Sequence, residues 1–193
     1  MADERVIAFH WKKIMNELGV DSASDNFRDT PERVAKSLIQ ICGGLYDTDN
    51  RVAEIMKTRF PSSYDEMIVE KGIDAIGMCP HHFLPIQYDI VVGYIPSSDG
   101  YVIGLSKIPR LVVLLAARPI LQEELAMDIS YEMDHWLNPL GVGVVVDGSH
   151  GCMTCRGVKM RDARTITAKM TGVFKDDPIV RREFMSYYQN NGS

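Results

Sequence analysis

The sequence lacks the features of a membrane-spanning, secreted or bulk nucleic-acid-binding protein. No apolar run approaches the ~18 to 20 residues that cross a bilayer. The first residues, MADERVIAFHWKK, contain no basic leader followed by an apolar core. Basic residues are the minority, with 21 Lys and Arg against 26 Asp and Glu. We therefore expect a cytoplasmic protein without a secretory signal, and neither a nucleic-acid partner nor a membrane partner.

Phosphate-binding loops and cysteines are also scarce. Neither the P-loop pattern nor the dinucleotide pattern occurs, so a bound phosphate would have to be held by side chains.

Only four cysteines occur in 193 residues. In a chain without an export signal they are expected to stay reduced, which points to metal binding, catalysis or core packing. The apolar fraction of 46% is that of one globular domain or two small ones.

Hydrophobic periodicity predicts helices on either side of a group of strands. Every even position from Leu84 to Tyr94 is apolar, which predicts a long strand with one buried face. Thr30 before Pro31 is typical of a helix start, with Thr30 as the cap. The expected elements are helices over 6–18, 31–42 and 51–57, a strand over 84–94 in a hairpin with 101–103, helices over 107–117 and 121–137, strands over 142–146 and 164–174, and a closing helix to about 188. This order predicts an α+β fold with an antiparallel sheet whose helices cover one face.

Cysteine and histidine gather in two short segments. Cys79 and His82 lie three residues apart in a predicted turn, and Cys152 follows the Val-rich strand. Thiolate and imidazole are the ligands that zinc prefers, and a site with three protein ligands keeps one position open. His81 and His150 stand beside these ligands as candidate proton donors and acceptors. The pattern favours an open, catalytic zinc site.

Two other interpretations of these segments stay open at this point. Short motifs of this kind also arise by chance, because Cys is often a small buried residue and His an ordinary surface or core residue. Alternatively, Cys155 is a fourth ligand, which would close the zinc site and make it structural.

Basic residues recur at helical spacing. Lys107 and Arg110 lie three apart, as do Arg33 and Lys36, and Arg156 follows Cys152 by four positions. Residues at that spacing share a helix face, as a ligand with several phosphates would require. A solvated helix surface is the ordinary alternative.

An amide and a carboxylate stand side by side at the start of the helix over 121–137. The carboxylate of Glu123 is able to accept hydrogen bonds from the N–H edge of a guanine or pterin ring, and the amide of Gln122 suits the other polar edge. Acidic residues at a helix start also occur simply because they complement the helix dipole.

Seven ordered motifs give the chain a resemblance to the GTP cyclohydrolase I family. They are DTPERVAKS (29–37), CPHHFLP (79–85), VIGLSKIPR (102–110), LQEEL (121–125), HGCMTCRGV (150–158), ARTIT (163–167) and GVFKDDP (172–178). The resemblance covers about residues 10–188. It implies the tunnelling fold, a four-stranded antiparallel sheet with two helices on one face, in a catalytic domain over 61–193 preceded by a helical extension over 1–60. The two parts are expected to form one functional unit.

The resemblance also implies a reaction and roles for single residues. Members of the family convert GTP into 7,8-dihydroneopterin triphosphate and formate, the first step towards tetrahydrofolate and other pterins. By motif, Cys79, His82 and Cys152 resemble the zinc ligands, His81 and His150 the catalytic histidines, Ser106 the serine of the ribose rearrangement, Gln122 and Glu123 the guanine contacts, and Lys107, Arg110, Arg156, Arg33 and Lys36 the triphosphate clamp. The last two are expected to reach in from a neighbouring subunit, because family members form ring-shaped homo-oligomers, usually decamers.

The chain departs from the family at two positions near the expected metal. Pro80 stands where the family usually has Glu, so a carboxylate and a backbone donor are absent beside Cys79. Cys155 stands where an apolar residue is common, and we expect it to pack in the interior. The departure at Pro80 keeps two other functions open: a tunnelling-fold enzyme for a related purine or pterin, and a non-enzymatic ring protein with a structural zinc.

Overall fold

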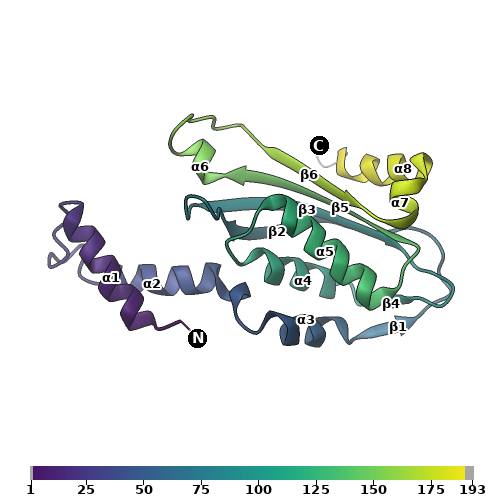
Figure 1. Ribbon diagram of the computed structural model, residues 1–193, viewed down its shortest axis with the longest axis horizontal. Coiled ribbons are helices and arrows are strands. Elements are labelled where there is room, and N and C mark those ends of the chain that lie inside the picture. The colour runs from purple at the N-terminus through teal and green to yellow at the C-terminus, as the bar shows by residue number, and fades with distance from the viewer. Residues whose placement is uncertain (1, 190–193) are drawn as a thin grey trace.

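The computed structural model describes residues 2–189, which form eight α-helices, a 3₁₀ turn and six strands (Figure 1). In chain order the elements are α1 (Glu4–Glu17), α2 (Thr30–Ile41), η1 (Gly43–Leu45), α3 (Thr48–Met56), β1 (Arg59–Pro61), β2 (Ile68–Met78), β3 (Pro85–Ile95), β4 (Tyr101–Ile103), α4 (Lys107–Ala116), α5 (Gln122–Leu137), β5 (Gly141–His150), α6 (Gly151–Thr154), β6 (Thr165–Met170), α7 (Gly172–Asp176) and α8 (Pro178–Gln189).

Four long strands build the main sheet in the order β2-β3-β5-β6, and every pair is antiparallel. The register places Ile86 of β3 opposite His150 of β5, and Tyr88 opposite Gly148. The end of β5 therefore lies beside the start of β3. The α+β class with an antiparallel sheet, as predicted from periodicity, is confirmed.

Helices cover both faces of this sheet, although the sequence predicted only one covered face. α4 and α5 pack on the face that carries the main core, to which β3 contributes Ile86, Ile90 and Val92 (Figure 1). On the other face, Val91 and Val145 pack against Phe174 and Phe184 from α7 and α8. This second core explains why Val91 is fully buried at an odd position of β3.

Three local predictions are wrong. Tyr101–Ile103 does not form a hairpin with β3 but pairs with Arg59–Pro61 of β1. The strand expected over 164–174 ends at Met170, because Gly172, with a positive φ of 48°, begins the short helix α7. The second helix begins one residue early: Asp29 is its N-cap residue, and Thr30 already lies within α2.

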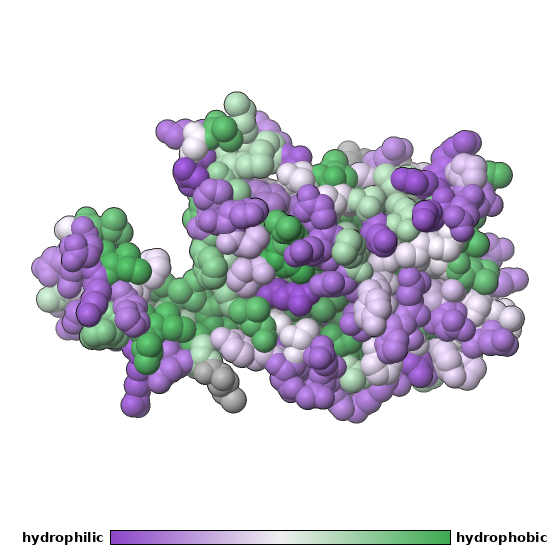
Figure 2. Space-filling view, in the orientation of Figure 1, coloured by the Kyte–Doolittle hydropathy of each residue, from purple (hydrophilic) through white to green (hydrophobic). Residues whose placement is uncertain are grey.

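The first two helices form an arm at one end of the molecule (Figure 1). α1 and α2 pack on each other, and α1 leaves Val6, Phe9 and Leu18 exposed. Hydrophobic residues are visible on this arm in Figure 2. α3 differs from them, because its Val52 and Met56 belong to the main core. No helix within residues 2–189 is long and apolar enough to cross a membrane.

Candidate metal centre and its surroundings

Cys79, His82 and Cys152 come together at one end of the sheet. One ligand atom from each lies within 4.8 Å of the others, and no other such group of His, Cys, Asp and Glu occurs in the described chain. Cys79 Sγ lies 3.7 Å from Nδ1 of His82. Cys79 is buried, Cys152 half-buried and His82 exposed, so the group opens to the surface on one side. Two thiols and an imidazole form a donor set that fits zinc.

Backbone geometry brings these three ligands together. Between Cys79 and the start of β3, the Cys79 N–H donates to Leu84 O (2.9 Å) and the Phe83 N–H to Cys79 O (2.9 Å). Phe83 adopts a positive φ of 52°, which closes the turn that carries His82. On the neighbouring strand, His150 ends β5 and is the N-cap residue of α6, so that Cys152 lies in the first turn of that helix. The pairing of β3 with β5 then places both segments at the same end of the sheet.

Gln122 fixes the orientation of His150. Its Nε2 donates to Val146 O (2.9 Å) and Thr165 O (2.7 Å), which only accept, so its Oε1 faces His150 Nε2 at 2.8 Å. This network assigns the proton of a neutral His150 to Nε2 and leaves a lone pair on Nδ1. Burial lowers the pKa of His150, while Glu123 opposes that effect. The neutral imidazole is thereby favoured.

Gly148 makes room for this hydrogen bond. A Cβ at this position would lie 2.3 Å from Gln122 Oε1 and 3.2 Å from His150 Nε2. Sequence reasoning missed Gly148, although a glycine within a Val-rich strand often marks a close approach by another group.

The side chain of Gln122, which the resemblance predicts to contact guanine, is engaged inside the chain in this structure. It is only 2% exposed, and both ends of its amide are engaged inside the chain. The neighbouring Glu123 is exposed at the start of α5. The two adjacent residues thus differ in the structure: the amide of Gln122 is bonded to His150, whereas the carboxylate of Glu123 is accessible to solvent.

The remaining predicted residues lie on the surface or are partly exposed. His81 is exposed beside His82, their ring centroids being 6.3 Å apart. Ser106 is the exposed N-cap residue of α4, which begins with Lys107 and carries Arg110 on its first turn. Arg156 is exposed after α6. It acts on the metal group electrostatically: burial and Cys79 raise the pKa of Cys152, while Arg156 lowers it.

Arg33 and Lys36 lie apart from that group, on α2. Arg33 pairs with Asp29 (3.4 Å), and Lys36 approaches Glu4 of α1 (3.9 Å). Both side chains are largely exposed. Within one chain they are surface residues of the arm.

Cys155 does not pack in the interior, so that prediction is wrong. Its side chain is exposed, and Sγ donates to Gly151 O at 2.7 Å. A one-turn helix directs this thiol back along its own backbone. Cys155 is also outside the group of ligand atoms formed by Cys79, His82 and Cys152.

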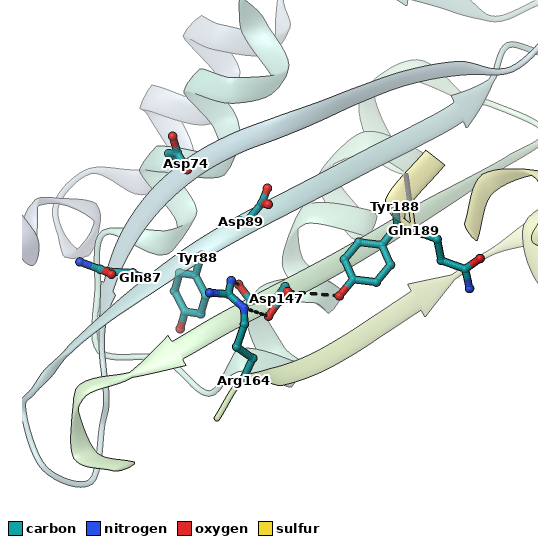
Figure 3. Close-up of a pocket in the computed structure, with 8 residues that line it drawn as sticks. All are labelled: Asp74, Gln87, Tyr88, Asp89, Asp147, Arg164, Tyr188 and Gln189. Carbon is teal, nitrogen blue, oxygen red and sulfur yellow. Dashed lines mark hydrogen bonds and ion pairs between the residues drawn. The ribbon is translucent and has the colours of Figure 1, made fainter. Parts of the chain in front are cut away.

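A second polar cluster lies on the opposite face of the sheet, around a cavity of about 520 Å³ (Figure 3). It gathers three carboxylates, Asp74, Asp89 and Asp147. Arg164 Nε binds Asp147 Oδ1 at 2.7 Å, and the Tyr188 hydroxyl lies 3.1 Å from Asp147 Oδ2. Burial, and then Asp74 and Asp147, raise the pKa of Asp89, while Arg164 lowers it. Arg164 thus pairs directly with one of these carboxylates, Asp147, and partly offsets the repulsion at Asp89.

The antiparallel sheet with a Cys-His-Cys group at its end defines an α+β protein equipped to hold a metal beside a half-buried, oriented histidine. Comparison with known proteins identifies the family within this class. The model of the family GTP cyclohydrolase I matches residues 7–189, and the chain belongs to this family of hydrolases.

Several curated relatives carry the name GTP cyclohydrolase 1. The one from Dehalococcoides mccartyi is 35% identical over 192 residues and is covered completely, as is this chain. The relative from Thermoanaerobacter pseudethanolicus is 38% identical, with 96% of this chain and 97% of the relative covered. That from Chlorobaculum tepidum is 40% identical over 92% of this chain and 78% of its own length. A solved archaeosine synthase QueF-Like structure is 21% identical with a TM-score of 0.42, covering 57% of this chain and 96% of that one, a likeness too distant to bear on function.

Proposed function

We propose that this chain is a zinc-dependent GTP cyclohydrolase that converts GTP into 7,8-dihydroneopterin triphosphate and formate. The observation that carries the proposal is the open three-ligand group of Cys79, His82 and Cys152, in a chain that belongs to this family. Cys155 is directed towards the Gly151 carbonyl, which supports a site with three protein ligands and one open position. Zinc in such a site supplies Lewis acidity for hydrolysis.

His150 moves protons in this proposal. Its Nε2 proton is held by Gln122 Oε1, so Nδ1 is the atom that accepts a proton and returns it as the imidazole ring of the substrate opens. This hydrogen bond to the buried Gln122 holds the ring in place, so the imidazole does not have to be oriented during the reaction. His81, exposed beside His82, is the second proton carrier.

Charged groups around the metal group bind the remainder of GTP. The exposed carboxylate of Glu123 accepts hydrogen bonds from the N–H edge of guanine, and Ser106 assists the ribose rearrangement. Lys107, Arg110 and Arg156 bind the triphosphate.

Arg33 and Lys36 complete the triphosphate clamp of a neighbouring subunit. Within their own chain they are largely exposed and belong to the arm, where their only acidic contacts in the described chain are on the arm itself. Exposed Val6, Phe9 and Leu18 on the same arm support burial against another copy. We therefore propose a tunnelling-fold homo-oligomer in the form of a ring, with a decamer as the expected size.

The test is an assay of purified protein loaded with one zinc per subunit and incubated with GTP. We expect formate and, after oxidation, a fluorescent pterin. A fully zinc-loaded protein that releases neither product would contradict the proposal. Analytical ultracentrifugation of the same sample tests the oligomer, since a monomer would leave the clamp without Arg33 and Lys36.

A further inference from the structure

Tyr88 is a buried polar residue that the proposed function does not use. It lies on β3 with only 3% of its surface exposed, and it belongs to the main core. Its hydroxyl oxygen is buried and has no hydrogen-bond partner within the part of the chain that the structure describes. Buried hydroxyls nearly always have a partner, because leaving one unpaired is costly. The residue therefore requires an explanation.

The side chain of Tyr88 leans towards the metal group. Its backbone is paired with Ala75 of β2, yet a Cβ built on Gly77 would lie 2.8 Å from the ring atom Cε2 and 3.5 Å from Cζ. The ring thus extends along β2 in the direction of Cys79. On the other side its ring meets that of His150 edge-on, with centroids 6.4 Å apart. In Figure 3, Tyr88 points away from the side of β3 on which Asp89 lies.

Two acidic groups, Cys79 and Glu123, lie close enough to the Tyr88 hydroxyl to affect its pKa. Burial raises the pKa of Tyr88 most, followed by the negative charges of Cys79 and Glu123. The phenol consequently stays protonated and remains a hydrogen-bond donor throughout the physiological range. Of these two acidic groups, Cys79 is buried and Glu123 is exposed to water.

When a metal binds, Cys79 would lose its contact with His82 Nδ1 (3.7 Å) as a hydrogen bond, because His82 is itself a candidate ligand. A sulfur that binds a metal carries negative charge, and at 4% exposure Cys79 has little access to water. The next residue, Pro80, has no backbone N–H to offer. The amide of Gln122 is engaged by Val146, Thr165 and His150. A donor without a partner, Tyr88, therefore lies at the same end of the sheet as a sulfur whose contact with His82 would become shared metal ligation once the metal binds.

We propose that Tyr88 is a positioning residue of the metal centre, whose hydroxyl donates a hydrogen bond to Sγ of Cys79 when that sulfur binds the metal. The inference rests on the metal site of the proposed function. The hydroxyl has no such bond within the described chain, so the proposed contact requires a shift of the Tyr88 or Cys79 side chain when the metal binds. Hydrogen bonds to metal ligands of this kind change metal affinity by about 10- to 100-fold.

The experiment compares Tyr88→Phe with Tyr94→Phe. Tyr94 is a matched control, because it lies on the same strand and face, is 1% exposed, and its hydroxyl already accepts the Ile103 N–H at 3.2 Å. Zinc affinity is measured by competition with a chromophoric chelator. The thiolate-to-metal absorption of the cobalt-loaded proteins reports the hydrogen bond to sulfur directly. We expect Tyr88→Phe to weaken zinc binding about 10-fold and to shift the cobalt band, and Tyr94→Phe to do neither.

Thermal unfolding separates this role from simple packing. Without metal, Tyr88→Phe should unfold at the same or a higher temperature than wild type, because it removes an unpaired hydroxyl, while its gain in Tm on adding zinc should be smaller. Wild-type zinc affinity and an unshifted cobalt band in Tyr88→Phe would overturn the inference and leave the proposed function intact. A wild-type protein that binds neither metal would overturn both.

Discussion

Two adjacent residues of β3, Tyr88 and Asp89, point to opposite faces of the sheet (Figure 3). On the face of Tyr88, the side chains of Gln122 and His150 are joined by a hydrogen bond close to the end of the sheet that carries Cys79, His82 and Cys152. On the face of Asp89, three carboxylates line one cavity, and Asp147 among them is paired with Arg164 and contacts the Tyr188 hydroxyl. The first face thus holds a hydrogen-bonded amide and imidazole, whereas the second face holds three carboxylates close together.

The two faces differ in their effect on the free energy of folding and on the orientation of groups suited to catalysis. Gln122 is buried and His150 half-buried, and the hydrogen bond between them holds one imidazole tautomer in place, which suits chemistry. Around Asp89 the like charges oppose one another, so their energy depends on pH. We therefore expect changes on the first face to act on activity, and changes on the second face to act on stability.

The largest effect is expected from His150→Ala. Loss of the group that moves the proton should lower kcat by about 10²- to 10⁴-fold. Zinc content, measured by metal analysis, should stay at the wild-type level, since His150 is not among the grouped ligands. Ser149→Ala changes the preceding residue, which points to the other face, and should keep activity within about twofold of wild type. Comparable losses in both variants would break the distinction between the faces.

A smaller loss of activity is expected from Gly148→Ala. The added Cβ would lie 2.3 Å from Gln122 Oε1, which forces the amide away from His150. Because small misplacements at a reacting group are costly, kcat should fall by about 10²-fold while zinc content is retained. Gly43→Ala is the matched control, since a Cβ there meets nothing within 4 Å. Wild-type kcat in Gly148→Ala would show that this hydrogen bond does not position His150.

The sequence predicted the Cys-His-Cys group that the structure brings together, but not the polar groups that lie around it. Cys79, His82 and Cys152 are recognisable because their chemistry is rare and their motifs are ordered. Tyr88 escaped notice because periodicity counts a tyrosine at an even position as one more apolar residue. Its unpaired hydroxyl becomes visible only when the surrounding atoms are placed.

The fold was predictable where its signals are local. The helices and the long strand β3 follow from periodicity within single segments. The pairing of Tyr101–Ile103 could not be predicted in this way. A three-residue strand carries little pattern, and its partner, Arg59–Pro61, lies far back in the chain. The second covered face was missed for a similar reason, since Phe174 and Phe184 approach Val91 only in the folded chain.

Asp89→Asn should change stability without changing activity. Burial and the neighbouring carboxylates raise the pKa of Asp89 in the folded state above its ordinary value, so its charge opposes folding at any pH above the folded pKa. We expect the variant to have a higher Tm at pH 7, by about 2–4 °C. The advantage should shrink as the pH falls through the folded pKa and vanish only well below the ordinary value of 3.8, where the carboxyl is protonated in both states. The exposed loop residue Asp99, changed to Asn, serves as control. A constant difference in Tm from pH 4 to pH 7 would contradict this account.

The smallest effect is expected from Cys155→Ala. The thiol is exposed, and its one hydrogen bond, to Gly151 O, stays within its own helical turn, so its loss should cost little stability. Zinc content and kcat should both match wild type, because the three ligand atoms that lie together do not include this sulfur. Loss of zinc from the variant would instead mean that Cys155 closes the site as a fourth ligand. A closed site has no position left for chemistry, so this comparison decides between a catalytic and a structural metal centre.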